Sequence, residues 1–383
     1  MSNEAQKKEF FIKKVKEICN RWFITAFSGM AQGLFCTLIA GTIIKTIGEK
    51  ISAFTSFGAV LVLIGQLASI LTGAGIGAGM ATYLKAPRLV VFSAIVAGFM
   101  GAYAEQVMGA TVAYNSISVS LNGNIQSVSA LLVKGLPGNP ISAYVCALMA
   151  IELGNLVQGK TKLDILVVPL TCIFSAYVGC FVAIPFIWLI KVLSKGIDIA
   201  TGTMPFLMGI VIAVVMGILL TMPTSSAAIW ASIATGVETN NMYLAGGAAV
   251  VGCACHMVGF AVASFKENGV GGLISQGLGT SMLQIPNIMK KPIIMLPMII
   301  SSAICGPLST CVFKLLCNAS GGGMGTSGLV GVFGVIAVEG QNPLIMWLGI
   351  ILLLFVLPAV LNFAISQFMR KKGWIKDGDM KLD

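Results

Sequence analysis

The chain has 383 residues, of which 57% are hydrophobic and only 10% are charged. Soluble globular domains carry about 25% charged residues, so the composition excludes a water-exposed body and predicts a polytopic membrane protein with repeated apolar spans of about 20 residues. The net charge of +10 does not indicate a nucleic-acid partner, because the lysines and arginines gather before the first apolar segment and after the last. Such residues accumulate in cytoplasmic segments, so we expect both termini in the cytoplasm.

Residues 1–22 predict a cytoplasmic amphipathic helix. One helical face is roughly apolar, with lysines opposite, and consists of Phe10, Phe11, Ile12, Val15 and Ile18. This pattern is typical of a helix lying on the membrane surface. A solvated cap is the alternative. Acidic and basic residues are mixed here, and no short apolar core with a cleavage site follows, so we do not expect a signal peptide.

Apolar segments then follow along nearly the whole chain. They lie near 23–46, 57–73, 88–106, 140–157, 164–194, 204–222, 242–262, 292–317 and 343–368. The Gly-rich sequence LTGAGIGAGM (71–80) indicates either a tight helix crossing or a break between two shorter helices. Residues 107–139 are polar and predict an extracellular excursion or a partly buried loop. The ten cysteines include no Cys-x-x-Cys, so we expect buried, reduced thiols and no metal or cofactor.

Two segments of the second half are as long as a span but too polar for a lipid-facing helix. Residues 266–287 and 318–343 contain the near-repeats GLGTSML (277–283) and GMGTSGL (323–329). Irregular backbone at membrane depth occurs only where protein or water surrounds it, so we predict re-entrant hairpins near 262–290 and 318–343 with these loops at their tips. Close helix packing, with Ser and Thr bonding between helices, is the alternative.

Tryptophans and one acidic residue have simpler interpretations. Trp188, Trp230, Trp347 and Trp374 lie close to predicted span ends, where the interfacial aromatic belt explains them. Glu152 lies within apolar sequence and is either a functional carboxylate or a residue at a helix end near basic side chains.

Four stretches follow one another in an order known from one family of transporters. They are KTKLDILVVPLTCIFSAYVGCFVAIPFIWLIKVL (160–193), GILLTMPTSSAAI (217–229), GGLISQGLGTSMLQIPN (271–287) and KKPIIMLPMIISSAICG (290–306). In these stretches the chain resembles subunit IIC of bacterial phosphotransferase-system (PTS) sugar permeases, over roughly 135–340. The resemblance is closest to the fructose-like end of the glucose superfamily. A branch of stand-alone IIC-like proteins, some described as regulators of toxin genes, is closer still.

The resemblance implies an all-α fold of about ten transmembrane helices and two re-entrant hairpins, forming a homodimer in the bacterial plasma membrane. An N-terminal membrane domain (23–200) would make the dimer contact. A substrate-binding domain (201–368) would move across the membrane like an elevator, and residues 369–383 would form a cytoplasmic tail.

The chain departs from the family pattern at LISQG (273–277). Gln276 stands where the family commonly has a glutamate, and an amide can bond sugar hydroxyls but cannot act as a base toward them. No segment outside the apolar runs is long enough for the phosphocarrier domains IIA or IIB. We therefore predict no catalytic residue, and coupling of transport to phosphorylation would need separate IIA and IIB proteins.

Polar side chains near the two loops are the candidate solute ligands. The hydroxyls that follow Pro223 either line a polar cavity or satisfy the break in the helix that this proline causes. For His256, the single histidine, the alternatives are an interhelical hydrogen bond, metal binding, and the role in the solute site or in gating that the resemblance suggests. Glu339 is either a solute contact or a hairpin anchor. The candidate solute-binding residues are Thr224, Ser225, Ser226, His256, Gln276, Thr280, Ser281, Gln284, Asn287, Thr326 and Glu339, and the hairpin glycines are Gly277, Gly279, Gly323 and Gly325.

The sequence therefore predicts a IIC-like permease that binds a small polar, carbohydrate-like solute and exposes it alternately to either side of the membrane. Two alternatives remain open. One is a non-transporting sensor or regulator that keeps the fold, and the other is a phosphorylating permease that works with separate IIA and IIB proteins.

Overall fold

The computed structural model describes residues 13–52, 54–108, 138–222 and 225–382, and within these residues it contains helices and turns but no strand. The chain divides into two compact units. Unit 1 comprises Met1–Ala40 and Gln66–Trp188, and unit 2 comprises Gly41–Gly65 and Leu189–Asp383. Most of the expected surface helix 1–22, nearly all of the polar stretch 107–139, and Thr224 lie outside the described residues.

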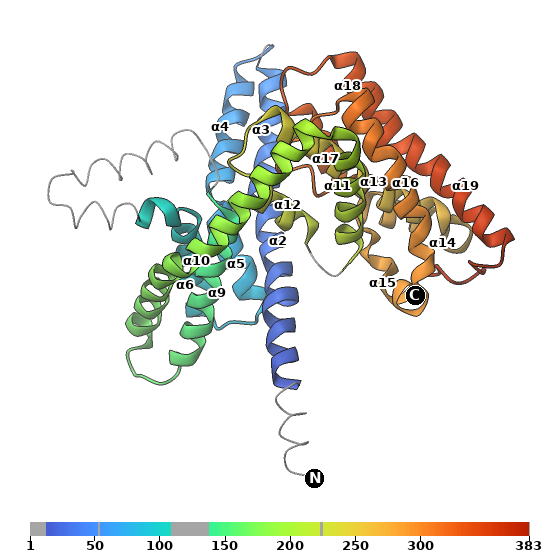
Figure 1. The fold of residues 1–383 in the computed structure, drawn as a ribbon. Coiled ribbons are helices and arrows are strands. Elements are labelled where there is room, and N and C mark those ends of the chain that lie inside the picture. Colours follow the sequence, from blue (N-terminus) through green and yellow to red (C-terminus); the bar gives the residue numbers. More distant parts are fainter. Residues whose placement is uncertain (1–12, 53, 109–137, 223–224, 383) are drawn as a thin grey trace, which may run out of the picture. The chain divides into compact units, whose positions relative to one another are not determined.

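The helices, including short 3₁₀ and π segments labelled η, account for most of the described chain (Figure 1). They are η1 (Asn20–Ala26), α2 (Phe27–Leu34), η2 (Phe35–Ile39), α3 (Ala40–Ile51), α4 (Phe57–Ile70), α5 (Thr72–Tyr83), α6 (Arg88–Ala102), α9 (Pro140–Val157), α10 (Asp164–Thr203), α11 (Pro205–Thr221), α12 (Ser226–Ala234), α13 (Asn240–Ala263), α14 (Phe265–Ile274), η3 (Ser275–Gly279), η4 (Ser281–Gln284), α15 (Ile285–Lys290), η5 (Pro292–Met295), α16 (Leu296–Pro307), η6 (Leu308–Phe313), η7 (Ser327–Leu329), α17 (Val330–Ile336), α18 (Pro343–Gly349), η8 (Ile350–Val356) and α19 (Leu357–Lys371).

Six described helices are long and apolar enough to cross a membrane, or seven if the bent pair α4 and α5 forms one span. Three further apolar helices are shorter, and these are Arg88–Ala102, Pro205–Thr221 and Ser327–Ile336. The chain is therefore a multi-pass, all-helical membrane protein, while the expected number of about ten spans stays a prediction.

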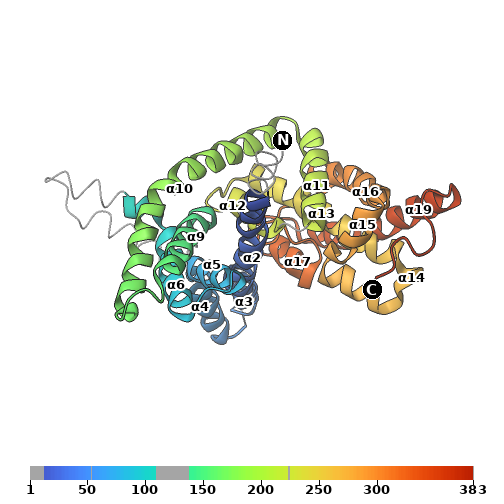
Figure 2. The ribbon, with the colours of Figure 1, turned by 90° about the horizontal axis from the view of Figure 1, so that it is seen from below.

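Unit 1 is built around the glycines of α5, which packs against α2, α6 and α9 (Figure 2). A Cβ added at Gly33 would lie 2.2 Å from the Gly75 carbonyl oxygen, and one at Gly77 would lie 1.9 Å from the Ala94 oxygen. The backbones touch directly, as small residues permit in membrane helices. Both interpretations of the 71–80 stretch are confirmed, because α5 is tightly packed and also follows a 52° bend after α4.

The Glu152 carboxylate is bound within unit 1. It accepts a hydrogen bond from Nε of Arg21 at 2.8 Å and another from the Trp22 indole at 3.1 Å. The Tyr144 hydroxyl in turn donates to the Trp22 carbonyl at 2.6 Å. Glu152 lies inside α9, five residues before its last residue Val157, and thus holds Arg21 and Trp22 of η1 against α9. Its cationic partner is Arg21 rather than Lys160 and Lys162, which follow α9.

Unit 2 is built around α13, of whose apolar 18-residue window 94% is buried. This helix packs against α11, α16 and α19, and Figure 1 shows it between α11 and α16. Close approach again depends on glycine, since a Cβ at Gly252 would lie 1.9 Å from the Ala213 oxygen and one at Gly247 would lie 1.7 Å from the Leu315 oxygen. Both glycine loops pack against the buried α13, the first through η3 and the second at Gly325.

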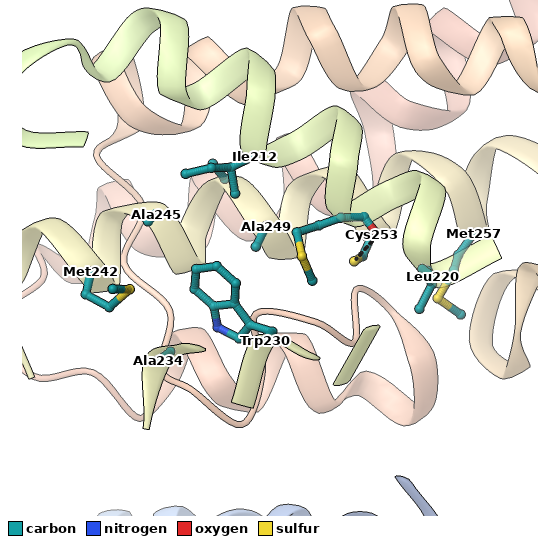
Figure 3. Close-up of a cluster of buried hydrophobic side chains, with 11 residues drawn as sticks. Ile212, Leu220, Trp230, Ala234, Met242, Ala245, Ala249, Cys253 and Met257 are labelled. Atoms are coloured by element: carbon teal, nitrogen blue, oxygen red, sulfur yellow. Dashed lines mark hydrogen bonds between the residues drawn. The ribbon is translucent and has the colours of Figure 1, made fainter. Parts of the chain in front are cut away.

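Trp230 does not belong to an interfacial belt, and that expectation is wrong. Its side chain is 1% exposed and lies against Met242, Ala245 and Ala249 of α13 (Figure 3). The reason is that α12, although only nine residues long, is buried along most of its length, since six of its residues are buried: Ser226, Ala228, Trp230, Ala231, Ser232 and Ala234. Trp188, Trp347 and Trp374 are 65%, 49% and 49% exposed, as interfacial residues would be.

Candidate functional site

The two Gly-x-Gly-Thr-Ser loops bind each other. The Thr326 hydroxyl donates to the carbonyl of Gly277 at 2.6 Å, and the Ser327 hydroxyl donates to the carbonyl of Gly279 at 2.8 Å. We call this contact the loop junction. The side chains of the second loop thus recognise the backbone of the first, and Thr326 is fully buried.

The first loop ends a helix and begins another. After α14, the π segment η3 runs to Gly279, and the backbone then becomes extended at Thr280 (φ −158°, ψ 140°). The Thr280 hydroxyl accepts a hydrogen bond from the Met282 amide and so caps the short helix η4. Because the helical backbone ends at Gly279, the carbonyls of Gly277 and Gly279 can accept hydrogen bonds from the second loop.

Glycines seat the second loop against the core of unit 2. A Cβ at Gly322 would lie 2.2 Å from Nε1 of Trp230, and one at Gly323 would lie 2.5 Å from the Ser226 carbonyl oxygen. Gly325 has a left-handed backbone (φ +56°), and its Cβ would lie 2.8 Å from the backbone of α13 at Ala254. These positions need glycine both for space and, at Gly325, for conformation.

The start of α12 is tied to the same loop. The Ser226 hydroxyl donates to the Gly323 carbonyl at 2.7 Å. Ser225 instead accepts from the Ala228 amide at 3.1 Å and caps α12, so this hydroxyl satisfies the helix start that follows the break. Thr224 lies outside the described residues.

His256 belongs to a buried chain of polar groups that reaches the first loop. Its Nδ1 lies 2.9 Å from the Thr221 hydroxyl, which lies 3.1 Å from the Ser281 hydroxyl. All three side chains are fully buried. The second ring nitrogen, Nε2, is buried without a hydrogen-bond partner among the described residues, and in either tautomer it can still donate or accept one bond.

Three amides of the first hairpin segment form a continuous series that we call the amide ladder: Gln276, Gln284 and Asn287. Nε2 of Gln284 donates to Oε1 of Gln276 at 2.9 Å, and Nδ2 of Asn287 donates to Oε1 of Gln284 at 2.9 Å. Gln276 itself donates to the Ser264 hydroxyl and to the Gly272 carbonyl, both at 3.0 Å. Gln276 and Gln284 are fully buried.

The far end of the amide ladder is covered by the C-terminal segment. Gln284 donates to the Met380 carbonyl at 2.9 Å, and Asn287 donates to the Lys381 carbonyl at 2.8 Å. Asn268 extends this contact, donating to the Met380 carbonyl and accepting from the Leu382 amide, both at 2.8 Å. These predicted solute ligands are therefore bound to the chain's own tail.

Charged groups reinforce the tail contact. Arg370 donates to the buried Glu267 carboxylate at 3.1 Å and to Asp377 at 3.0 Å. Hydrogen bonds and attraction from Lys266, helped by Arg370, hold the pKa of the Asp377 carboxyl below its usual value. Burial disfavours the ionised form of Asp379, but the hydrogen bonds and positive charges of Lys291 and Lys376 together outweigh this effect, so the pKa of that carboxyl is also lowered.

The structure thus brings most of the predicted residues into unit 2 as two neighbouring networks. The loop junction and the His256 chain gather Ser226, His256, Gly277, Gly279, Ser281, Gly323 and Thr326, and the amide ladder holds Gln276, Gln284 and Asn287. Glu339 is exposed and contributes to neither network.

Three hydroxyl residues of these networks are not among the candidates predicted from the sequence. They are Thr221, Ser264 and Ser327. Thr221 ends α11 directly before the break, and this position at the end of a span was a usable signal. Ser264 lies four residues after Phe260, a buried aromatic residue of α13, and outside the predicted apolar segment 242–262. Nothing in the local sequence therefore indicated a role for this serine.

Comparison with known proteins assigns the family. The family model described as "Phosphotransferase system, EIIC" matches residues 24–382, which is nearly the whole chain. No curated protein matches the chain. Together with the apolar helices, this match supports the role of a sugar permease, with a carbohydrate substrate and IIA and IIB proteins as partners that the family implies. The chain belongs to the phosphotransferase system EIIC family.

Proposed function

We propose that unit 2 binds a small carbohydrate-like solute at the loop junction and that the protein carries it across the membrane by elevator-type alternating access. The observation that supports this best is the loop junction itself, where two irregular segments place hydroxyls and carbonyls at 2.6 and 2.8 Å inside an apolar helical protein. Family membership supports the substrate class.

The hydrogen-bonding groups of this region match the chemistry of a sugar. Each sugar hydroxyl donates one bond and accepts others, and the region offers acceptors at the glycine carbonyls and donors at Thr326, Ser327 and Ser281. The free Nε2 of buried His256 can make one further bond. Opening the loop junction would expose these groups, and a bound solute would replace the bonds that the two loops make with each other.

The remaining parts of the proposal follow the family. The hairpins at 262–290 and 318–343 would close on the solute, and residues 201–368 would move against a dimeric scaffold of residues 23–200. Both termini would lie in the cytoplasm of a bacterial cell. Gln276 cannot act as a base toward a solute hydroxyl, so the proposal assigns no phosphorylation step to this residue. Separate IIA and IIB proteins, as partners that the family implies, would have to supply any phosphoryl group.

A second function is a sensor or regulator that binds the solute without transporting it. The observation in its favour is the amide ladder, whose members bond one another and the tail and so keep the hairpin in one arrangement. Solute accumulation in sealed vesicles that contain the purified protein would exclude this alternative.

The first experiment is thermal unfolding of the detergent-purified protein with a panel of sugars, polyols, sugar acids and sugar phosphates. A ligand at 100 times its dissociation constant stabilises the folded state by about 2.7 kcal/mol, which moves the melting temperature measurably. The stabilisation should disappear in Thr326→Val and persist in Thr203→Val, which removes an exposed hydroxyl of α10. If no compound of the panel stabilises the native protein, a carbohydrate solute is contradicted.

A further inference from the structure

The last described residues, 376–382, lie across the amide ladder, and we call them the strap. Two aspartates attach it to Lys266 of α14, to Lys291 directly after α15 and to Arg370 of α19. Asp377 accepts from Lys266 and from Arg370, each at 3.0 Å, and Asp379 accepts from Lys291 at 2.6 Å. The Lys266 and Asp377 side chains are 71% and 68% exposed, and exposed ion pairs of this kind are weak and easily exchanged.

An apolar anchor supplies the rest of the attachment. Met380 is fully buried and Ile375 is 1% exposed, and both pack into a cluster that includes Phe260, Ile288 and Met298. The strap therefore has a defined seat on unit 2, held by one inserted methionine and by ion pairs at the surface.

The donor groups of the amide ladder are fully used while the strap is seated. Each side-chain amide has two N–H groups. Gln284 donates one hydrogen bond to Gln276 and the other to the Met380 carbonyl. Asn287 donates one hydrogen bond to Gln284 and the other to the Lys381 carbonyl. A solute oxygen that accepts a hydrogen bond from Gln284 or Asn287 must therefore displace a carbonyl of the strap.

We propose that the strap is a self-inhibitory segment that competes with the solute for Gln284 and Asn287. The seated strap supplies two backbone carbonyls and a carboxylate to these amides and to Lys291, so it imitates an oxygen-rich solute. Released, it leaves the same donors for the hydroxyl, carbonyl or anionic oxygens of a carbohydrate-like compound. This inference rests on the proposed function and extends the solute site from the loop junction, whose Gly277 directly follows Gln276, to the amide ladder. It adds a means of regulation by anything that binds the tail.

The seat of the strap is tested by the accessibility of position 380. Met380→Cys places a thiol at a fully buried position, and a membrane-impermeant maleimide at pH 7 reports how often it becomes exposed. Adding Asp377→Asn and Asp379→Asn should raise the labelling rate of Cys at this position at least tenfold, because the ion pairs are removed while the amides are untouched. Asp164→Asn, in unit 1, should leave the rate unchanged. An equal rate in all variants would overturn the inference.

Hydrogen exchange of the strap in chains that retain Met380 repeats this comparison without the cysteine. The backbone amides of Gly378 and Leu382 donate to Glu267 and Asn268, so they should be protected in the native chain. They should exchange at least tenfold faster in the double asparagine variant. Slow exchange in both chains would contradict release of the strap.

Competition is tested by solute affinity, measured by thermal stabilisation with the same sugar panel. We expect the double asparagine variant to bind a stabilising compound several times more tightly than the native chain, and that compound to accelerate maleimide labelling of the Met380→Cys chain. Equal affinity of the two chains overturns the strap inference alone. Stabilisation of neither chain overturns both this inference and the proposed function, so the two failures are distinguishable.

Discussion

The Thr326 hydroxyl donates a 2.6 Å hydrogen bond to the Gly277 carbonyl, and this bond joins two loops whose sequences nearly repeat each other. The contact is asymmetric, because a side chain of the second loop binds the backbone of the first. The repeated motif therefore has two different roles within unit 2: the second copy donates hydrogen bonds through its hydroxyls, and the first copy accepts them through its backbone carbonyls.

Removing the Thr326 hydroxyl should weaken both folding and solute binding. Thr326→Val keeps the shape of the side chain but leaves the Gly277 carbonyl without its partner, which costs about 1–3 kcal/mol in unfolding free energy. We expect a lower melting temperature and at least tenfold weaker solute binding, whereas Thr326→Ser should retain both. A valine variant with the native melting temperature would show that the bond contributes nothing.

Glycine should be essential at Gly325 and replaceable at Gly279. An alanine at Gly325 combines a left-handed backbone, which costs about 1–2 kcal/mol, with a Cβ 2.8 Å from the backbone of α13. At Gly279 an added Cβ meets nothing within 4 Å. We expect Gly325→Ala to reduce the yield of monodisperse protein in size-exclusion chromatography and Gly279→Ala to behave as native. The opposite order would contradict the described seat of the second loop.

The His256 ring should depend on Gly217. A Cβ at Gly217 would lie 2.4 Å from Cδ2 of His256 and 2.8 Å from the Gly252 carbonyl oxygen, so Gly217→Ala should displace the ring and break its bond to Thr221. We expect a fall of about 1–3 kcal/mol in the unfolding free energy, as for other overpacked cores. The control is Gly196→Ala in α10, where a Cβ meets nothing and alanine should be neutral or stabilising by up to about 1 kcal/mol.

Breaking the pair between Arg370 and Glu267 should be costly. The two side chains are only 10% and 6% exposed, so Arg370→Ala leaves the Glu267 carboxylate buried without its partner, at a cost of about 3 kcal/mol. Lys266→Ala removes an exposed cation that also binds Asp377 and should cost less than about 1 kcal/mol. Thermal melts of both variants make the comparison, and equal losses would count against a buried pair.

Acid should release the strap. The pKa values of Asp377 and Asp379 are lowered in the folded protein, so their contribution is complete above the ordinary aspartate pKa of about 3.9 and is lost as the pH falls below it. Hydrogen exchange of Leu382, whose amide donates to the uncharged Asn268 side chain, should therefore show loss of protection on acidification after correction for the intrinsic effect of pH. In the chain with Asp377→Asn and Asp379→Asn this acid-dependent loss should be absent.

Composition and local pattern were sufficient to predict a helical membrane protein and its family. The reason is that the apolar spans and the stretches that resemble the family each consist of adjacent residues. The importance of the two loops was also predictable from the repeated Gly-x-Gly-Thr-Ser. Their mutual contact was not, because Thr326 and Ser327 bind backbone carbonyls, which every residue has and no sequence pattern marks.

The occupants of the amide ladder could not be predicted for a related reason. Gln284 and Asn287 were expected to bind a solute, and they bind the carbonyls of a segment more than 90 residues away whose sequence, KDGDMKL (376–382), has no visible relation to theirs. Trp230 was misplaced because most residues of the short helix α12 are buried inside the protein, and apolar sequence alone does not distinguish such burial from exposure to lipid.

Unequal packing around the two loops bears on how this sequence can change over evolutionary time. Gly323 and Gly325 lie against the backbone of α12 and α13, whereas an added Cβ at Gly277 would make only an ordinary 3.4 Å contact and one at Gly279 none. The first loop is bound through its carbonyls, which survive any substitution of its side chains. Substitutions should therefore accumulate in the first copy of the motif and be removed by selection from the second. Among descendants of this chain, the two copies should become less similar because the first copy changes while the second stays the same.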